Sequence, residues 1–232
     1  MLEALRNAWK IPELRRRITF TFLMFLVFRI GSHVPVPGID PRVLQDVFNQ
    51  GNLLGFLDLF SGGALKRVSV FALSVTPYIT SSIVIQLLTI VIPSWEEMAK
   101  EGEEGRKKLA QYTRYATVIL ALIQALGMVA WMRNAVISPN WVTYTVIVLA
   151  LSAGTAFLMW LGEEITDKGI GNGISLIIFA GIVSRLPVAL GQVVGYLKVG
   201  AIGAINVVLL FLVTMAIVVA VIYVQEGERR IT

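Results

Sequence analysis

The chain has 232 residues, no cysteine and a single histidine, His33. Without cysteine there is no disulfide framework, no thiol nucleophile and no cysteine-based metal site. Zinc sites normally bring together three or four His, Cys or carboxylate ligands, so one histidine does not predict a zinc site. The sequence also lacks a nucleophile elbow, a P-loop and a zinc-protease motif. We therefore expect no metal, no cofactor and no enzymatic activity.

Charged residues are scarce as well. They make up 15% of the chain, whereas soluble domains carry about 25%. Hydrophobic residues make up 56%, and the mean hydropathy is +0.75. This composition is typical of a protein whose solvent is lipid. It predicts an all-α fold, a polytopic bundle of membrane-spanning helices.

A spanning helix needs roughly 20 mostly apolar residues, or about 17 at the short end. Six segments meet this criterion: 18–35, 76–92, 111–132, 141–161, 174–190 and 201–224. The first, second and fifth are interrupted or preceded by polar residues, glycine or proline. In a membrane, such helices normally face protein or a water-filled cavity.

The distribution of Lys and Arg predicts the orientation, because cytoplasmic segments carry an excess of these residues. With the N-terminus inside, the inner segments hold Arg6, Lys10, Arg15, Arg16, Arg17, Lys100, Arg106, Lys107, Lys108, Arg114, Lys168, Arg229 and Arg230. The outer loops hold Arg42, Arg133, Arg185 and Lys198. We expect both termini in the cytosol, and residues 1–17 to include a short interfacial helix or, alternatively, a frayed end. The net charge of +5 then reflects topology, and we expect no nucleic-acid binding.

Residues 53–67 are apolar enough to enter the membrane, but Asp58, Lys66, Arg67 and the pair Gly62-Gly63 prevent them from lying in lipid. A re-entrant half-helix inside a cavity fits best. The alternative is an amphipathic helix on the outer surface of the membrane.

Three further segments could carry function. Val75 and Ile79 flank Pro77 and share one helix face, which is typical of plain helix packing or, alternatively, of a gate. The glycines of 162–173 predict a tight cytosolic turn, because the spacing and the preceding membrane helix do not fit a nucleotide-binding fingerprint. The mixed charges of 96–108 predict a solvated loop, with a docking role as the alternative.

The sequence contains the strings FRIG (28–31) followed by PVPG (35–38), FSGGAL (60–65), TPYI (76–79), KEGEEGR (100–106), MWLGE (159–163), GIGNGIS (169–175) and ERRI (228–231). Together these strings resemble the SecY family of protein-conducting channels. The resemblance runs in order from about residue 10 to the end. It implies a fold of ten spans in two five-helix halves related by an inverted repeat, of which this chain resembles the first half and helix 6.

The resemblance also implies a domain division. Residues 1–17 would form the interfacial helix, and 18–190 the five-helix half. That half would include a plug at about 53–67, a cytosolic 2/3 loop at 94–110 and a cytosolic 4/5 loop at 162–173. Residues 191–232 would form helix 6 and the start of the 6/7 loop.

The implied function is that of the central subunit of a translocation channel in the bacterial inner membrane. It would pass unfolded secretory polypeptides across the bilayer and membrane segments sideways into it. The matching positions are Val75, Ile79, Ile174 and Ile178 for the pore ring; Leu57, Asp58, Phe60, Ser61, Gly62, Gly63, Lys66 and Arg67 for the plug; Thr76, Pro77, Tyr78, Thr80 and Gln86 for one side of a lateral gate; and Lys100, Arg106, Lys107 and Lys108 for a cytosolic docking loop.

The implied partners are the subunits SecE and SecG, the motor SecA, the ribosome, signal sequences, nascent polypeptides and membrane lipid. The alternative from another class is a secondary transporter with broken helices and an inverted repeat. A transporter predicts ionisable residues near the bilayer midplane, and the centres of 111–132, 141–161 and 201–224 contain none.

Overall fold

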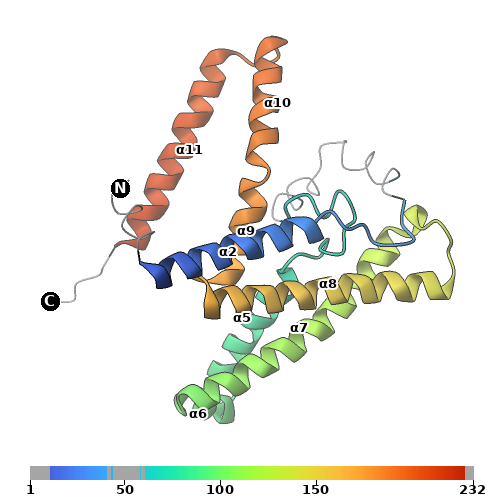
Figure 1. The fold of residues 1–232 in the computed structure, drawn as a ribbon, viewed down its shortest axis with the longest axis vertical. Coiled ribbons are helices and arrows are strands. Elements are labelled where there is room, and N and C mark those ends of the chain that lie inside the picture. The colour runs from blue at the N-terminus through green and yellow to red at the C-terminus, as the bar shows by residue number, and fades with distance from the viewer. Residues whose placement is uncertain (1–10, 41–42, 44–57, 59–60, 228–232) are drawn as a thin grey trace. The chain divides into compact units, whose positions relative to one another are not determined.

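The computed structural model describes residues 11–40, 43, 58 and 61–227. Its helices, shown in Figure 1, are α2 (Pro12–Gly31), α5 (Thr76–Val91), α6 (Pro93–Lys100), α7 (Glu103–Trp131), α8 (Trp141–Lys168), α9 (Gly173–Val183), α10 (Leu186–Lys198) and α11 (Ala204–Gln225), with a short 3-10 helix at Arg133–Ala135. The chain divides into two compact units, Met1–Ser184 and Arg185–Thr232.

Several helices are long and apolar enough to cross a membrane. Within the described part of the chain, four single stretches qualify: Glu103–Trp131, Trp141–Lys168, Gly173–Lys198 and Ile205–Gln225. α5 and α6 qualify only as a pair, bent by 103°, which brings the number to at most five. The structure thus confirms a helical fold with several apolar spans.

Proline and asparagine set many of the helix ends. Proline stands in the first turn of α2, α5, α6 and α10, where its missing N–H costs no hydrogen bond. Ile92 separates α5 from α6, and Pro93 begins α6 at the sharp bend. Asn140 and Asn172 cap α8 and α9 by accepting hydrogen bonds from backbone N–H groups.

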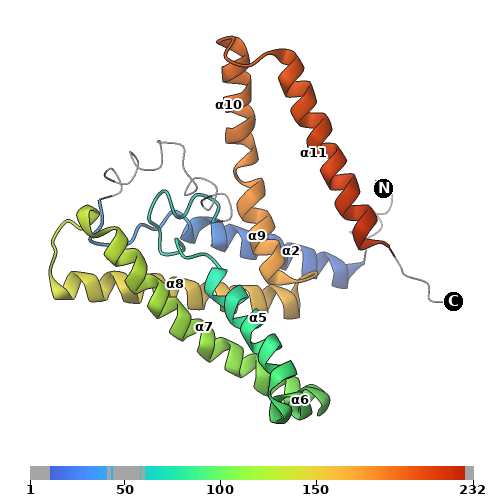
Figure 2. The same cartoon turned by 180° about the vertical axis from the view of Figure 1, so that it is seen from behind.

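The first unit is built around α8. Figures 1 and 2 show α2 beside α8 and α5 beside α7, and α8 also contacts α7 and α9. Residues 61–75, which we call the turn segment, pack against α8 at Gly154, where an added Cβ would collide with the backbone carbonyl of Val70. One apolar cluster joins Val36 and Val68 to α7 and α8. A second joins α2, the turn segment, α8 and α9.

The second unit contains α10 and α11, joined by residues 199–203. α11 has the highest hydropathy of the four stretches, 3.1, and none of its span residues is buried within the chain. Its side chains are therefore available to lipid or to further protein.

The structure differs from the sequence-based expectations in three segments. Within the expected half-helix, residues 61–67 consist of turns, and Asp58, the other described residue, is helical. The expectation of a loop at 96–108 was wrong, because α6 and the first turns of α7 occupy these residues. Gly102, with φ +82°, separates the two helices. The turn expected at 162–173 is shorter, because α8 continues to Lys168.

Candidate functional site

A pocket of about 570 Å³ lies between α5, α7, α8 and α9, and we call it the α5–α9 pocket. Three of the four pore-ring candidates, Ile79, Ile174 and Ile178, line it. The lateral-gate candidates Tyr78 and Gln86 line it too. The remaining lining residues are Ser82, Ile83, Ala110, Arg114, Glu163, Thr166, Asp167, Asn172 and Ser175. Residues from the second and fifth expected spans thus meet at one cavity.

Val75 lies apart from the pocket. It is the N-cap residue of α5, and its side chain is 2% exposed within the apolar cluster that contains Phe28, Phe71 and Leu158. Ile79, one turn further along, is 36% exposed. The i, i+4 spacing puts the two residues on one side of the chain, but they have different surroundings, and their membership of one ring remains a prediction.

The inner wall of the pocket is polar. Arg114 on α7 donates from Nε to Oε1 of Glu163 on α8, over 2.8 Å. Both side chains are partly exposed, so the pair is in contact with water. The pocket therefore has isoleucines on α5 and α9 and an ion pair on α7 and α8. The sequence analysis assigned neither Arg114 nor Glu163 to the site. The signal that could have found them is that these two opposite charges lie near the same end of two consecutive expected spans.

Close helix approach positions the α9 isoleucines. A Cβ at Gly173 would collide with the carbonyl of Gly162 on α8. The Thr166 hydroxyl donates to that carbonyl and accepts from the Gly173 N–H, both over 2.9 Å. Asn172 accepts from the Ser175 N–H over 3.2 Å and caps the helix. These contacts hold the first turn of α9 against α8, so Ile174 faces the pocket.

The hydroxyl groups at the start of α5 donate hydrogen bonds to backbone carbonyls of the same helix. Thr80 Oγ1 donates to the Thr76 carbonyl over 3.1 Å, and Ser81 Oγ donates to the Pro77 carbonyl over 2.8 Å. Pro77 is buried, whereas Thr76 and Thr80 are exposed. The exposed pair therefore presents a mildly polar surface, and its role in a gate stays a prediction.

A buried carboxylate organises the polar segment that precedes α5. Asp58 is 1% exposed, and its Oδ1 accepts from the Lys66 N–H over 2.9 Å and from Ser61 Oγ over 3.2 Å. The hydrogen bonds close a compact loop. The plug candidates Leu57 and Phe60 lie outside the described residues.

Two cations tie this loop and α2 together. Arg29 on α2 donates from its guanidinium to the Gly62 carbonyl over 3.3 Å and to Ser184 Oγ over 3.2 Å. Arg67 donates to Nε2 of His33 over 2.7 Å. The sequence analysis included Arg29 only within the family-like string FRIG and gave it no partner. A charged residue within an apolar segment normally has a polar partner in the protein, and this rule could have predicted that Arg29 has such contacts.

Glycine is required where the loop meets α9. Gly62 and Gly63 have φ of +63° and +90°, which L side chains rarely adopt. A Cβ at Gly62 would lie 3.1 Å from Cα of Gly181. The loop therefore lies backbone to backbone against α9.

The four docking candidates are on α6 and α7. Lys100 pairs with Glu96 at 2.6 Å, and this hydrogen bond and charge lower the pKa of Glu96. Arg106, Lys107 and Lys108 are exposed on the first turns of α7. They present a cationic surface at one end of that helix. Among the described residues, no three His, Cys, Asp or Glu side chains are grouped to hold a metal ion.

Comparison with known proteins gives consistent results. The SecY family model matches residues 69–232. The chain is 47% identical over 234 residues to "Protein translocase subunit SecY" of Pseudomonas aeruginosa, covering 99% of this chain and 53% of that protein. It is 48% identical over 241 residues to the protein of the same name from Halalkalibacterium halodurans, covering 100% of this chain and 56% of that protein. The chain thus spans about half the length of these relatives.

Two solved structures share the fold. Sec61 in the canine ribosome–channel complex from the endoplasmic reticulum matches with a TM-score of 0.66 at 18% identity, over 98% of this chain and 54% of that one. A structure titled as a protein-conducting channel matches with a TM-score of 0.62, also at 18% identity, over 91% of this chain and 51% of that one.

Proposed function

The chain belongs to the SecY family, and we propose that it forms the first half of a channel through which unfolded secretory polypeptides cross a membrane and membrane segments leave sideways into the bilayer. The α5–α9 pocket carries this proposal. It combines a polar wall with four isoleucines from two helices, Ile79, Ile83, Ile174 and Ile178. Such a mixture suits a passage that admits water on one side of an apolar constriction.

The proposed topology has six spans in a bacterial inner membrane, with both termini in the cytosol. α2 would be the first span, and α5 the second. Arg29 supports a spanning α2, because its guanidinium bonds to protein groups within the first unit instead of facing lipid. The excess of Lys and Arg in the proposed inner segments supports the orientation.

The proposed seal is formed by the apolar side chains of Ile79, Ile174 and Ile178, which line the α5–α9 pocket, and Val75 would support the ring from its buried place in the adjacent core. Side chains that make only dispersion contacts suit a passage for peptides of any sequence, because each atomic contact gains only about 0.1–0.2 kcal/mol and specifies no partner. An apolar constriction also opposes ion flow by dewetting when it is empty. The other half of the channel would supply the rest of the ring.

The proposed plug is the loop around Asp58 and residues 61–67. Arg29 donates to the Gly62 carbonyl and Arg67 donates to His33 at the edge of this loop. Hydrogen bonds to charged groups contribute about 1.5–3 kcal/mol each. In the proposal, an entering polypeptide replaces these bonds and the packing of Gly62 on α9 when it displaces the loop.

The proposed partners follow from family membership: SecE, SecG, the motor SecA and the ribosome, with signal sequences and nascent polypeptides as substrates. The exposed cations Arg106, Lys107 and Lys108 offer a docking surface for a cytosolic partner. Thr76, Pro77, Tyr78, Thr80 and Gln86 would form one side of the lateral gate.

Crosslinking tests the proposal directly. Ile79→Cys or Ile178→Cys is placed in a cysteine-free full-length channel, and a secretory polypeptide with one cysteine is stalled during transport. We expect disulfide crosslinks at both positions. Ile123→Cys is the matched control, because Ile123 is an exposed α7 isoleucine, 58% exposed, that does not line the α5–α9 pocket. Equal crosslinking at position 123, or none at 79 and 178, contradicts the proposed path.

A further inference from the structure

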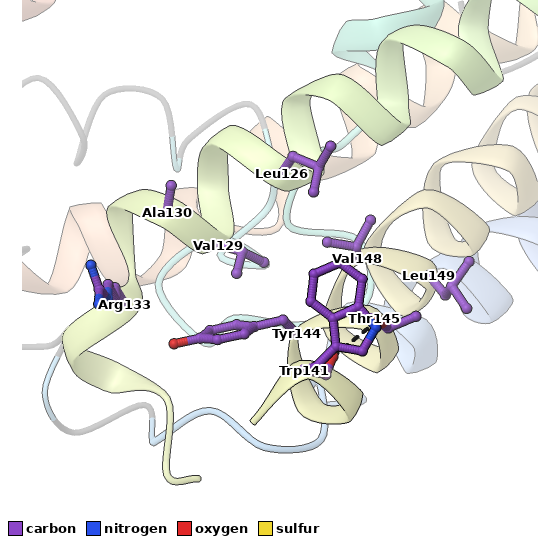
Figure 3. Close-up of a pocket in the computed structure, with 9 residues that line it drawn as sticks. All are labelled: Leu126, Val129, Ala130, Arg133, Trp141, Tyr144, Thr145, Val148 and Leu149. Carbon is purple, nitrogen blue, oxygen red and sulfur yellow. Dashed lines mark hydrogen bonds between the residues drawn. The ribbon is translucent and has the colours of Figure 1, made fainter. Parts of the chain in front are cut away.

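A second pocket, of about 530 Å³, lies between the last turns of α7 and the first turns of α8 (Figure 3). We call it the α7–α8 groove. Leu126 and Val129 on α7 and Val148 and Leu149 on α8 form its apolar walls. Its volume is within the range of about 300–1,000 Å³ that is typical of ligand sites.

Polar and aromatic groups gather at one end of the groove. Arg133, Trp141 and Tyr144 line it there (Figure 3), and Arg133 is the one charged residue among those that line it. Within the described part of the chain, no carboxylate pairs with the Arg133 guanidinium and no group hydrogen-bonds the Tyr144 hydroxyl. The groove therefore offers a cation and a phenol with unused donors beside an apolar trough.

The position of these groups along the helices indicates the level of the membrane interface. α7 ends at Trp131 and α8 begins at Trp141, and both helices are apolar enough to span. Tryptophan, tyrosine and arginine at the ends of spanning helices lie where hydrocarbon gives way to headgroups. The apolar trough then runs toward the hydrocarbon.

We propose that the α7–α8 groove binds an anionic phospholipid of the bilayer, with one acyl chain between α7 and α8 and the phosphate at Arg133. The Arg133 guanidinium donates to the phosphate oxygens, which match its fork of donors. The Tyr144 hydroxyl donates to the same headgroup. Trp141, which is 81% exposed, covers the glycerol region of the lipid.

Charge favours a lipid over a protein helix as the occupant. An apolar spanning helix from another protein would supply no counter-charge for Arg133 at the level of the headgroups. An anionic phospholipid supplies both the acyl chain and the counter-charge. The inference does not depend on the proposed translocation function, because it uses neither the α5–α9 pocket nor the plug.

The test uses the full-length channel in vesicles of equal phosphatidylglycerol and phosphatidylcholine. Either lipid carries a photoreactive diazirine in its acyl chain, and crosslinks are mapped by mass spectrometry to residues 126–149. We expect phosphatidylglycerol to label these residues about fivefold more than phosphatidylcholine, because one basic side chain favours an anionic headgroup by about that factor. Arg133→Gln should abolish this preference.

Two controls separate headgroup recognition from general effects. Lys198→Gln removes another basic side chain that does not line the groove, and the preference should persist. Ala130→Trp fills the groove and should reduce labelling by both lipids, whereas Ile123→Trp, on an exposed part of α7 outside the groove, should not.

Four results overturn the proposal. The first three are equal labelling by the two lipids in the unaltered channel, a preference that survives Arg133→Gln, and labelling that Ala130→Trp leaves unchanged. A partner helix in the groove would give no lipid labelling and a crosslink from Ala130→Cys to another subunit, which also overturns it.

Discussion

Val75 and Ile79 are the residues at which a packing role and a sealing role can be separated. Val75 is 2% exposed in the core, whereas Ile79 is 36% exposed at the α5–α9 pocket. Val75→Asn should lower the free energy of unfolding by about 3 kcal/mol, because it removes buried apolar surface and leaves a buried amide without partners. Ile79→Asn should change it by less than about 0.5 kcal/mol.

Thermal unfolding in detergent and ion conductance in planar bilayers measure the two effects. The Ile79→Asn channel should be assembled and should leak ions at rest, because an amide wets the constriction. If Ile79→Asn destabilises the channel as much as Val75→Asn does and the surviving protein stays tight to ions, then Ile79 is a packing residue and the seal lies elsewhere.

Other residues of the site show what a single sequence can and cannot reveal. The i, i+4 pattern and the family-like strings were enough to select Ile79, Ile174 and Ile178, which meet at one pocket. Arg29 and the Arg114–Glu163 pair were missed as site residues, because their roles come from contacts across more than 30 positions of sequence. Such contacts exist only once the helices have packed.

At the scale of helices, α8 packs closely on the turn segment, and this contact predicts how substitution of Gly154 changes the stability of the protein. A Cβ at Gly154 would collide with the backbone carbonyl of Val70, and backbone cannot turn aside as a side chain can. Gly154→Ala should therefore destabilise the protein by about 1–3 kcal/mol. Gly127, on α7, has no atom within 4 Å of an added Cβ. Gly127→Ala should be neutral or stabilise by up to about 1 kcal/mol through helix propensity.

Thermal unfolding of the two variants under the same conditions checks this prediction. The pair is matched, since both glycines lie within apolar spans and both substitutions add one methyl group. A Gly154→Ala variant that is as stable as Gly127→Ala would mean that α8 and the turn segment do not touch in the folded channel.

Apolar run length predicted where several apolar helices lie, although only four single stretches within the described residues are long and apolar enough to span. Charge and glycine misled at the helix ends. The expected 76–92 corresponds closely to α5, and the expected 141–161 begins where α8 begins. The run at 96–108 looked like a loop because of its charges and glycines, yet the Glu96–Lys100 pair and the stacking of Trp95 on Tyr112, with ring centroids 5.3 Å apart, accompany a helical hairpin. Conversely, residues 61–75 do not form a regular helix, because Gly62, Gly63, Val68 and Ser74 have positive φ. Hydropathy gives no information about backbone angles.

At the scale of the whole molecule, α7 makes the topology testable with two positions. It is one helix of 29 residues, about 44 Å long at 1.5 Å per residue, which exceeds the thickness of a hydrocarbon core, about 30 Å. In the proposed topology α7 is a span, so we expect position 104 at its start and position 138 beyond its end on opposite sides of the membrane. The excess of Lys and Arg near position 104 assigns that side to the cytosol.

Glu104→Cys and Ser138→Cys, each in a cysteine-free full-length channel, are labelled with a membrane-impermeant maleimide. The labelling tests whether α7 crosses the membrane and whether its start faces the cytosol. Both residues are exposed, so burial does not limit labelling. In intact cells Ser138→Cys should react, and Glu104→Cys should react only after the membrane is permeabilised. The reverse pattern would invert the proposed orientation while keeping α7 as a span. Labelling of both positions from outside would mean that α7 does not cross the membrane, and the six-span topology would then be wrong, because α8 and every later span would lose its assigned direction.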